Sequence, residues 1–467
     1  MVFSSILFLF IYLPVVLAVY YLCPVRYRNV WLFLVNMVFY GWGEPVYIIL
    51  MVFSITVNFL FGILVGKYRD SNRLLSRRYL IINTVINLAL LIFFKYFDLI
   101  LVTLGLIPGL GFIKPLGITL PIGISFYTFQ TMSYPIDVYR GDSEVQNNYI
   151  NFGTFVALFP QLIAGPIVRY KDVASQLGFR SSSVDQFASG VRRFVIGLGK
   201  KVLIANNLGL LWDAFAVMPA SDLTVMASWL GIVGFSMQIY FDFSGYSDMA
   251  IGLGRMIGFE FLENFDYPYI SKSVTEFWRR WHMSLGTWFR DYVYIPLGGN
   301  RLGLRRQLFN IFVVWTLTGI WHGANWTFML WGIYYAIFLM LEKIVLLKVL
   351  DKLPSAVGHL YAVLVAVCGW VLFQFDLLGK CLIYYKAMFG LGSAGLFSSA
   401  DLYYLSNYLV VLLVAAFACT PAGKNIFNRL PEKLRGVLTP VLILVVLILS
   451  TAYLVDATYN PFLYFRF

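Results

Sequence analysis

The segment that decides the fold runs from Gln307 to Leu341 and reads QLFNIFVVWTLTGIWHGANWTFMLWGIYYAIFLML. It contains no Asp, Glu, Lys or Arg. As one straight helix it would be about 52 Å long, whereas the apolar core of a bilayer is only about 30 Å thick. Residues that break helices gather near its middle, at Gly319, Gly323 and Asn325. We therefore expect two helical arms that fold back on each other at this point.

His322 lies at the end of the first arm. About fifteen helical residues precede it in the arm, which corresponds to a rise of about 22 Å and puts the imidazole inside the membrane rather than in bulk water. An ionisable group at that depth is costly and is by default a functional hypothesis. The alternative is a histidine that only joins neighbouring helices through a hydrogen bond.

The composition is that of an integral membrane protein. The chain has 467 residues, of which 60% are hydrophobic and 12% charged, whereas soluble domains carry about 25% charged residues. We expect a single membrane-embedded domain over residues 1–467. The net charge of +12 fits cytoplasmic Lys and Arg loops and gives no reason to expect a nucleic-acid partner. The scattered histidines and cysteines lack the spacing of a metal site.

Apolar segments of suitable length predict an all-α polytopic membrane protein with about twelve crossings. The basic loops between them predict that both termini lie outside. One further apolar segment, 150–168, is interrupted by prolines and a glycine, and we expect a broken, re-entrant segment there. Besides the two arms, the predicted spans are 3–22, 30–41, 46–66, 79–103, 121–137, 191–212, 225–247, 357–375, 403–420 and 436–456.

Charged residues also occur within the predicted spans. Lys200 and Lys201 lie in one of them, and Asp242 and Asp248 lie near the inner end of the next. Carboxylates within a membrane need partners, and we expect arginine or hydroxyl groups in a structural role. The stretch 255–306 mixes basic and aromatic residues and predicts helices along the inner membrane surface.

Several motifs together resemble the membrane-bound O-acyltransferase (MBOAT) family, in particular its bacterial alginate O-acetyltransferase-like branch. The resemblance covers nearly the whole chain. It implies a ring of tilted helices around a thinned centre, with re-entrant and interfacial helices and a central tunnel. The motifs are SFYTFQ at 125–130, IDVYRG at 136–141, FPQLIAGPI at 159–167, FDFSGYSDMAIG at 241–252, WRRWH at 278–282, YIPLGGNR at 294–301, WHGANW at 321–326 and the terminal YFRF.

The resemblance implies that His322 is catalytic and that His282 is functionally important. Acyl transfer to a hydroxyl needs a base, and a neutral imidazole suits this task. We therefore expect His322 to be the general base, approached from outside. Asn325 either orients its ring or is only a turn residue at the break.

Arg279 and Arg280 come just before His282, and two interpretations are open for this group. The basic residues either line a cytoplasmic funnel that attracts the phosphates of a coenzyme A-type donor, most simply acetyl-CoA, or anchor a helix at the interface. His282 would contact the donor path in the first case.

The C-terminal segment carries the pattern Phe462-x-Tyr464-Phe465-x-Phe467. It resembles an aromatic motif found in partner peptides of related transferases, where the tyrosine is implicated as an acyl relay. Tyr464 would then accept the acetyl group near His322. The alternative is an aromatic anchor at the membrane surface.

The resemblance implies an enzyme of the bacterial cytoplasmic membrane, in contact with membrane lipid. It would move an acetyl group from a cytoplasmic thioester to a hydroxyl of a cell-envelope or secreted polysaccharide, through an extracellular SGNH-type acetyltransferase partner. A polytopic transporter or flippase for a polysaccharide precursor is the alternative, and it predicts transport that survives His322→Ala. A scaffold for polysaccharide export predicts that catalytic substitutions are silent.

Overall fold

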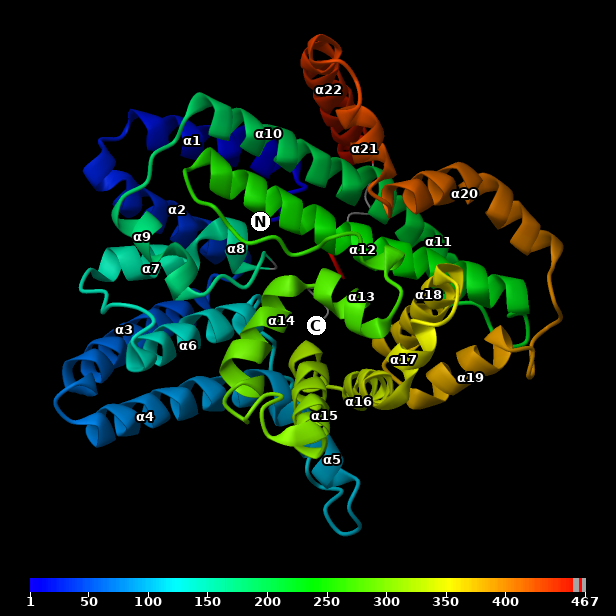
Figure 1. Ribbon diagram of the computed structural model, residues 1–467, viewed down its shortest axis with the longest axis horizontal. Coiled ribbons are helices and arrows are strands. Elements are labelled where there is room, and N and C mark those ends of the chain that lie inside the picture. Colours follow the sequence, from blue (N-terminus) through cyan, green and yellow to red (C-terminus); the bar gives the residue numbers. More distant parts are fainter. Residues whose placement is uncertain (164, 457–461, 464–467) are drawn as a thin grey trace. The chain divides into compact units, whose positions relative to one another are not determined.

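A computed structural model describes residues 1–163, 165–456 and 462–463, and these residues form helices with no β-strand (Figure 1). One isolated antiparallel bridge joins Phe265 and Trp281. The all-α fold expected from the apolar segments is therefore confirmed.

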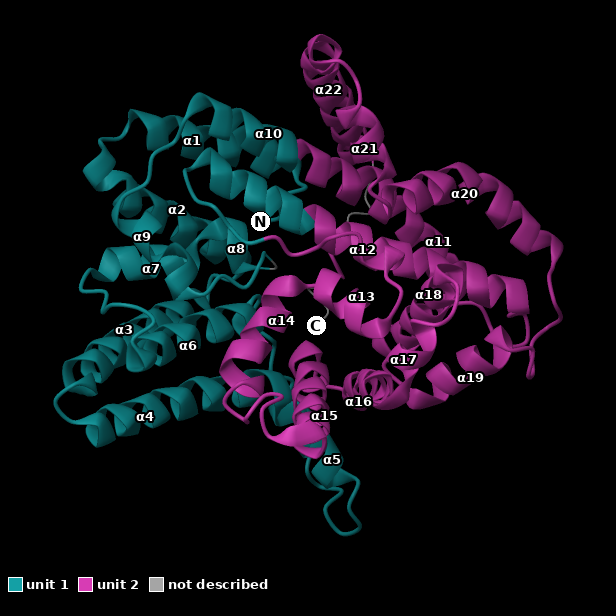
Figure 2. Ribbon diagram, viewed as in Figure 1, with its two compact units in different colours: residues 1–194, 246–262 teal, residues 195–245, 263–467 magenta. Residues whose placement is uncertain are grey.

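The described chain forms two compact units (Figure 2). Unit 1 contains residues 1–194 and 246–262, and unit 2 contains residues 195–245 and 263–467. A single domain over the whole chain stays a prediction.

Unit 1 is built from the N-terminal helices. α3, α4 and α6 pack against one another, and buried asparagines tie α3 to α4: Asn58 donates to Asn87 at 3.0 Å and accepts from Asn83 at 3.1 Å. Its helices are α1 Leu13–Leu22, α2 Arg28–Gly43, α3 Ile48–Arg69, α4 Arg73–Leu91, α5 Phe97–Gly105, α6 Ile124–Arg140, α7 Tyr149–Ala157, α8 Phe159–Leu162, α9 Tyr170–Gly178 and most of α10 Val184–Gly199.

The segment expected to be broken is broken in the structure. α7 ends at Ala157, and the single turn of α8 follows with Pro160 in its first turn. Residues 165–169 beyond α8 are not helical, and the described side chains around the break are mostly buried within unit 1. Irregular backbone is tolerated at membrane depth when protein covers it, so the burial fits a re-entrant segment.

Unit 2 contains the uncharged segment 307–341. α12 contributes its first part to unit 2 and its last part to unit 1. The remaining helices are α11 Asn206–Ala216, α12 Val225–Met256, α13 Val274–Arg280, α14 Met283–Phe289, α15 Gly303–His322, α16 Trp326–Leu341, α17 Leu347–Leu350, α18 Ser355–Gln374, α19 Leu378–Met388, α20 Ser399–Ala418, α21 Ala422–Asn428 and α22 Glu432–Asp456.

The two arms form the hairpin that their length predicts. α15 ends at His322, and α16 begins after Asn325, which is its N-cap. The helices pack along each other, and Gly319 and Gly332 meet where they touch. A Cβ added to either glycine would lie 3.0 Å from the Cα of the other. Close approach of two helix backbones requires small residues at the contact, which explains both glycines.

Six helical stretches in the described residues are long and apolar enough to cross a membrane. Each coincides with a predicted span, and the chain is a multi-pass membrane protein. The count of about twelve crossings stays a prediction. The six stretches are Ile48–Arg69, Arg73–Gly105, Val184–Ala216, Ser355–Gln374, Ser399–Ala418 and Glu432–Asp456.

The two carboxylates near the inner end of a predicted span have charged partners. Lys201 Nζ lies 2.7 Å from Asp242 Oδ1 in unit 2. Arg193 lies 2.9 Å from Asp248 in unit 1. The expectation of an arginine is thus confirmed for Asp248. For Asp242 it is wrong, because the charged partner that the structure shows is a lysine, Lys201.

Candidate active site

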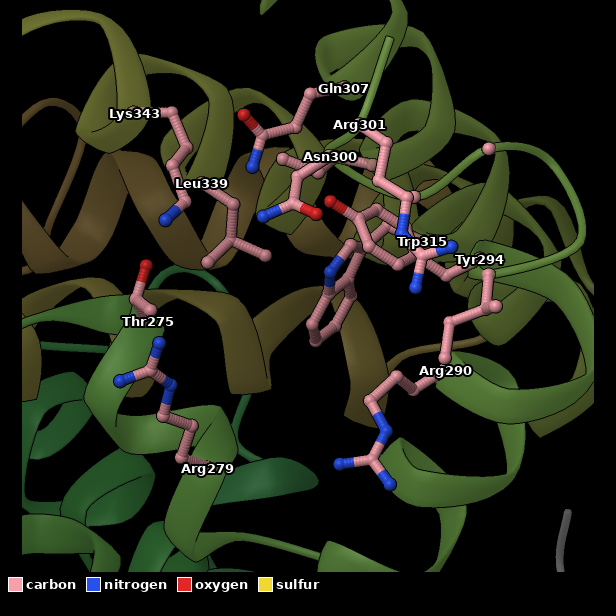
Figure 3. Close-up of a pocket in the computed structure, with 14 residues that line it drawn as sticks. Thr275, Arg279, Arg290, Tyr294, Asn300, Arg301, Gln307, Trp315, Leu339 and Lys343 are labelled. Carbon is pink, nitrogen blue, oxygen red and sulfur yellow. The ribbon is translucent and has the colours of Figure 1, made fainter. Parts of the chain in front are cut away.

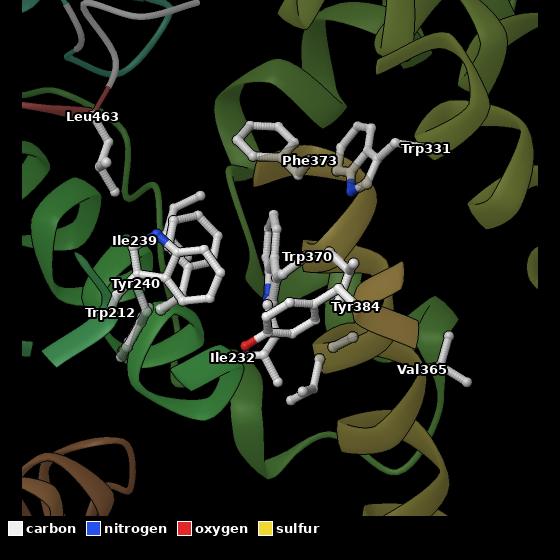
Figure 4. Packing of buried hydrophobic residues seen from close by; sticks show 14 of the residues in the cluster. Trp212, Ile232, Ile239, Tyr240, Trp331, Val365, Trp370, Phe373, Tyr384 and Leu463 are labelled. Carbon is white, nitrogen blue, oxygen red and sulfur yellow. The ribbon is translucent and has the colours of Figure 1, made fainter. Parts of the chain in front are cut away.

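His322 is buried in an aromatic cage within unit 2. Its side chain comes from the last residue of α15 and is 4% exposed. The ring centroids of Trp321, Trp331 and Phe373 lie 5.0, 5.0 and 5.3 Å from that of the imidazole. Trp331 belongs to α16 and Phe373 to α18, so three helices contribute to the cage. Figure 4 shows Trp331 and Phe373 together at one side of the buried cluster.

Asn325 acts as a turn residue in the structure. Its Oδ1 accepts from the backbone N–H of Thr327 at 3.1 Å and caps α16. Its Nδ2 donates to the carbonyl of Asp376 at 2.8 Å. The second contact fixes the hairpin turn to the start of the segment after α18. These hydrogen bonds favour the second interpretation of this residue, since the amide is engaged with backbone groups.

His282 occupies the junction between α13 and α14. Its φ of 45° and ψ of 52° lie in the left-handed region, which is rare for residues other than glycine and is commonest at functional sites. Its side chain is 3% exposed. Outside the candidate spans, where this residue lies, burial lowers the pKa of the imidazole to about 3, so the ring is neutral at physiological pH.

Asn264 fixes the orientation of the His282 ring. Its Oδ1 lies 3.1 Å from His282 Nδ1 and also accepts from the backbone N–H and hydroxyl of Ser284, at 3.2 and 2.9 Å. An amide oxygen only accepts, so Nδ1 carries the proton and Nε2 keeps its lone pair. The bridge between Phe265 and Trp281 holds the segments next to Asn264 and His282 side by side. Sequence reasoning missed Asn264, because eighteen residues separate it from His282 without a recognisable pattern.

Both histidines have ring contacts with the same tryptophan, Trp321. The ring centroid of Trp321 is 6.1 Å from that of His282 and 5.0 Å from that of His322. Phe243 of α12 packs against His282 at 4.7 Å. Both histidines expected to be functional therefore belong to one buried aromatic site.

A cavity of about 470 Å³ opens beside this site, and four of its lining side chains are cationic: Arg279, Arg290, Arg301 and Lys343. Figure 3 shows Arg279 and Lys343 converging near Thr275, with Arg290 and Arg301 on the other side of the cavity. Volumes of about 300–1,000 Å³ are typical of ligand sites. Of these four residues, only Arg279 was predicted from the sequence to bind the donor. Arg290 and Arg301 belong to the basic stretch 255–306, and Lys343 lies two residues beyond the uncharged segment that ends at Leu341.

Arg280 is not among the side chains that line this cavity. Its guanidinium is 2.8 Å from Asp266 and 3.1 Å from Glu276, and it also donates to the Asp266 carbonyl at 3.1 Å. The structure therefore separates the two neighbouring arginines, one at the cavity and one in ion pairs. For Arg280 the contacts favour an anchoring role.

A second cavity of about 240 Å³ adjoins the first and shares Arg279, Arg290 and Trp315 with it. It is mostly aromatic and apolar, and His282 and Thr318 line it. Thr318 lies one helical turn before His322 on α15. The lining thus changes from cationic to mostly apolar, and the second cavity reaches His282 and Thr318, whereas His322 is not among the residues that line either cavity. Tyr464, Phe465 and Phe467 lie outside the described residues.

Comparison with known proteins places this arrangement in a family. Residues 143–375 match the membrane-bound O-acyltransferase family. The chain is 40% identical to a probable alginate O-acetylase AlgI of Pseudomonas putida over 490 residues, covering 100% of each chain. It is 44% identical to the probable alginate O-acetylase AlgI of Pseudomonas aeruginosa over 84% of this chain and 76% of the relative. With the peptidoglycan O-acetyltransferase of Helicobacter pylori it shares 32% identity over 85% of this chain and 81% of the relative.

The chain therefore belongs to the membrane-bound O-acyltransferase family, and its likeness to the alginate O-acetylases confirms the branch that the motifs indicate. Family membership makes it an O-acyltransferase. It does not support the transporter and scaffold alternatives.

Proposed function

We propose that this O-acyltransferase takes an acetyl group from acetyl-CoA on the cytoplasmic side and delivers it for O-acetylation of a polysaccharide outside the cytoplasmic membrane. The observation that carries the proposal is the continuous change of lining from the basic cavity to the aromatic one. Cationic side chains suit the phosphates of the donor. The narrower apolar passage suits its uncharged pantetheine arm and thioester.

The basic residues at the entrance also support the proposed orientation. Lys and Arg accumulate on the cytoplasmic side of membrane proteins. Arg279, Arg290, Arg301 and Lys343 gather around one cavity, so that cavity is the proposed cytoplasmic entrance. In that orientation both termini lie on the outer side of the bacterial cytoplasmic membrane, as the basic loops of the sequence also predict.

In the proposed reaction His322 is the general base. Its neutral imidazole takes the proton of the acceptor hydroxyl while that oxygen bonds to the thioester carbonyl carbon. The carbon–sulfur bond then breaks, and the leaving thiolate of coenzyme A receives the proton from the imidazolium. An aromatic cage supports this role because it excludes bulk water, which would otherwise compete as acyl acceptor.

His282 has a different proposed role, at the donor path. Its ring lines the apolar cavity, and Asn264 keeps Nε2 as a hydrogen-bond acceptor. It orients the amide-containing arm of the donor as that arm approaches His322. Arg279 holds the donor phosphates at the entrance, and Arg280 stabilises the helix that carries Arg279.

The acceptor next to His322 is proposed to be Tyr464 of the C-terminal segment, which then passes the acetyl group to an extracellular SGNH-type transferase. In the first transfer the phenol oxygen bonds to the acetyl carbon as the carbon–sulfur bond breaks. In the second, the oxygen of the next hydroxyl bonds to that carbon as its bond to the phenol oxygen breaks, and the phenolate takes up the proton that this hydroxyl loses. The names of the relatives, alginate O-acetylase and peptidoglycan O-acetyltransferase, support a polysaccharide as the final acceptor.

The test uses the purified full-length protein with radiolabelled acetyl-CoA. Wild-type protein should release coenzyme A and carry label on its C-terminal peptide, as measured by mass spectrometry. His322→Gln should abolish both signals. His359→Gln should keep them, because His359 has no part in the proposed chemistry and its ring lies 3.2 Å from the Ser271 carbonyl. Full turnover in His322→Gln would exclude this histidine as the base. Full turnover without label on Tyr464 would exclude the relay alone.

A further inference from the structure

Asp242 of α12 joins three parts of unit 2. Its side chain is 2% exposed, and its Oδ1 lies 2.7 Å from Nζ of Lys201, which is also almost fully buried. Its Oδ2 accepts a hydrogen bond from the backbone N–H of Leu463 at 2.9 Å. Lys201 in turn donates to Asn206 at 2.8 Å. One carboxylate thus connects a buried cation with the main chain of the C-terminal segment.

Stability alone does not explain this ion pair. Removing two charges from water costs several kcal/mol per ion, and apolar side chains of similar size are often equally stable in the same place. Ionisable groups at membrane depth are functional hypotheses by default. The contact with Leu463 supplies a specific role, because Asp242 binds a backbone amide whose position it then fixes.

The held residue lies in the same buried cluster as the cage of His322. Leu463 is 3% exposed and packs in the cluster that also contains Trp331 and Phe373. Figure 4 shows it on the side of Ile239 and Tyr240.

Asp242 is also a sequence neighbour of a residue in the site. Phe243 follows it on α12 and packs against the ring of His282 at 4.7 Å. The attachment of the C-terminal segment is therefore built into the helix that supports the site.

We propose that Asp242, balanced by Lys201, is a positioning residue for acyl transfer that holds the C-terminal segment at Leu463. The next residue in the sequence is Tyr464, the proposed acyl relay. This inference rests on the proposed function, since it gives the attachment a purpose in the transfer step.

Two double variants separate positioning from folding. Lys201→Met with Asp242→Leu removes both charges and leaves no acceptor for the Leu463 amide. Lys201→Met with Asp242→Asn removes the same charges but keeps an acceptor oxygen. Both avoid an unpaired buried charge, the change that destabilises strongly, so the two proteins are matched in charge and close in size.

The first measurement is the kinetics of acetyl transfer by the full-length variants. The leucine variant should lose about 100-fold in kcat, the order expected when a reacting group is displaced by about 1 Å. Its KM for acetyl-CoA should stay as in wild type, because the donor cavity is untouched. The kcat of the asparagine variant should be at least about tenfold higher than that of the leucine variant. A general loss of folding would not produce this difference.

The second measurement is hydrogen exchange of the C-terminal peptide. Loss of a hydrogen bond to a charged group should accelerate exchange of the Leu463 amide by about 10- to 100-fold in the leucine variant. Wild-type exchange in that variant would overturn the proposed attachment. Fast exchange with wild-type kcat would overturn its role in transfer.

Failure of the relay gives a different result. Tyr464→Phe would then transfer at full rate in the wild-type background. The difference in kcat between the two double variants would persist if the segment is positioned for another purpose in the same reaction.

Discussion

Gly319 of α15 and Gly332 of α16 meet without any side chain between them. A Cβ on Gly332 would lie 3.0 Å from both Cα and N of Gly319 and would also meet the carbonyl oxygen of Trp315. The contact lies three residues before His322, so the spacing of the two backbones determines where the imidazole is held.

Replacing Gly332 by alanine should separate the two arms. The added Cβ would clash with backbone atoms of α15, which cannot move aside as the end of a flexible side chain can. Overpacking of this kind costs about 1–3 kcal/mol. We expect a lower melting temperature in detergent and a reduced kcat. Gly436→Ala in α22 is the control, because an added Cβ there meets nothing within 4 Å and alanine improves helix propensity by about 1 kcal/mol. Equal effects of the two substitutions would show that the contact does not position His322.

The two neighbouring arginines should behave differently in steady-state kinetics. Arg279 lines the basic cavity, so Arg279→Ala should raise the KM for acetyl-CoA by about tenfold or more, as expected for a lost hydrogen bond to a charged group. Arg280 is in partly exposed ion pairs. Arg280→Ala should therefore leave that KM unchanged and cost under about 1 kcal/mol of stability. A raised KM in Arg280→Ala with an unchanged KM in Arg279→Ala would show that acetyl-CoA does not bind in this cavity.

Asn264→Ala should free the ring of His282. The substitution removes the acceptor of His282 Nδ1 and of the Ser284 hydroxyl, and unsatisfied buried donors cost about 1–3 kcal/mol. Transfer should fall together with the melting temperature. Ser284→Ala, which keeps the contact between Asn264 and His282, should retain much more activity. A fully active Asn264→Ala protein would show that ring orientation is unimportant.

His282 should make the protein sensitive to acid. Its pKa is about 3 in the folded protein and about 6.5 in an unfolded chain. The unfolded state therefore binds more protons between these pH values, and stability is lost as the pH falls below about 6.5, by at most about 1.4 kcal/mol per pH unit. In His282→Gln the melting temperature should decrease less as the pH falls from 6.5 to 4.5 than it does in the wild-type protein. An unaltered slope in His282→Gln would assign the acid sensitivity to other groups.

The sequence by itself determined the features that depend on local length and residue type. An uncharged segment too long for one crossing had to fold back, and Gly319 to Asn325 marked the place. The same reasoning located the break after α7 and the six long apolar helices, because hydropathy and chain breaks are properties of neighbouring residues. The motifs led to the family in the same way.

Only the tertiary structure decided which distant groups meet. It brought Asn264 to His282, placed Lys343 with the arginines of the basic cavity, and paired Lys201 with Asp242. It also separated Arg279 from Arg280, although the two are adjacent in sequence. Such contacts depend on how helices pack, and one residue of rotation on a helix turns a side chain by about 100°, so spacing along a single chain does not specify them.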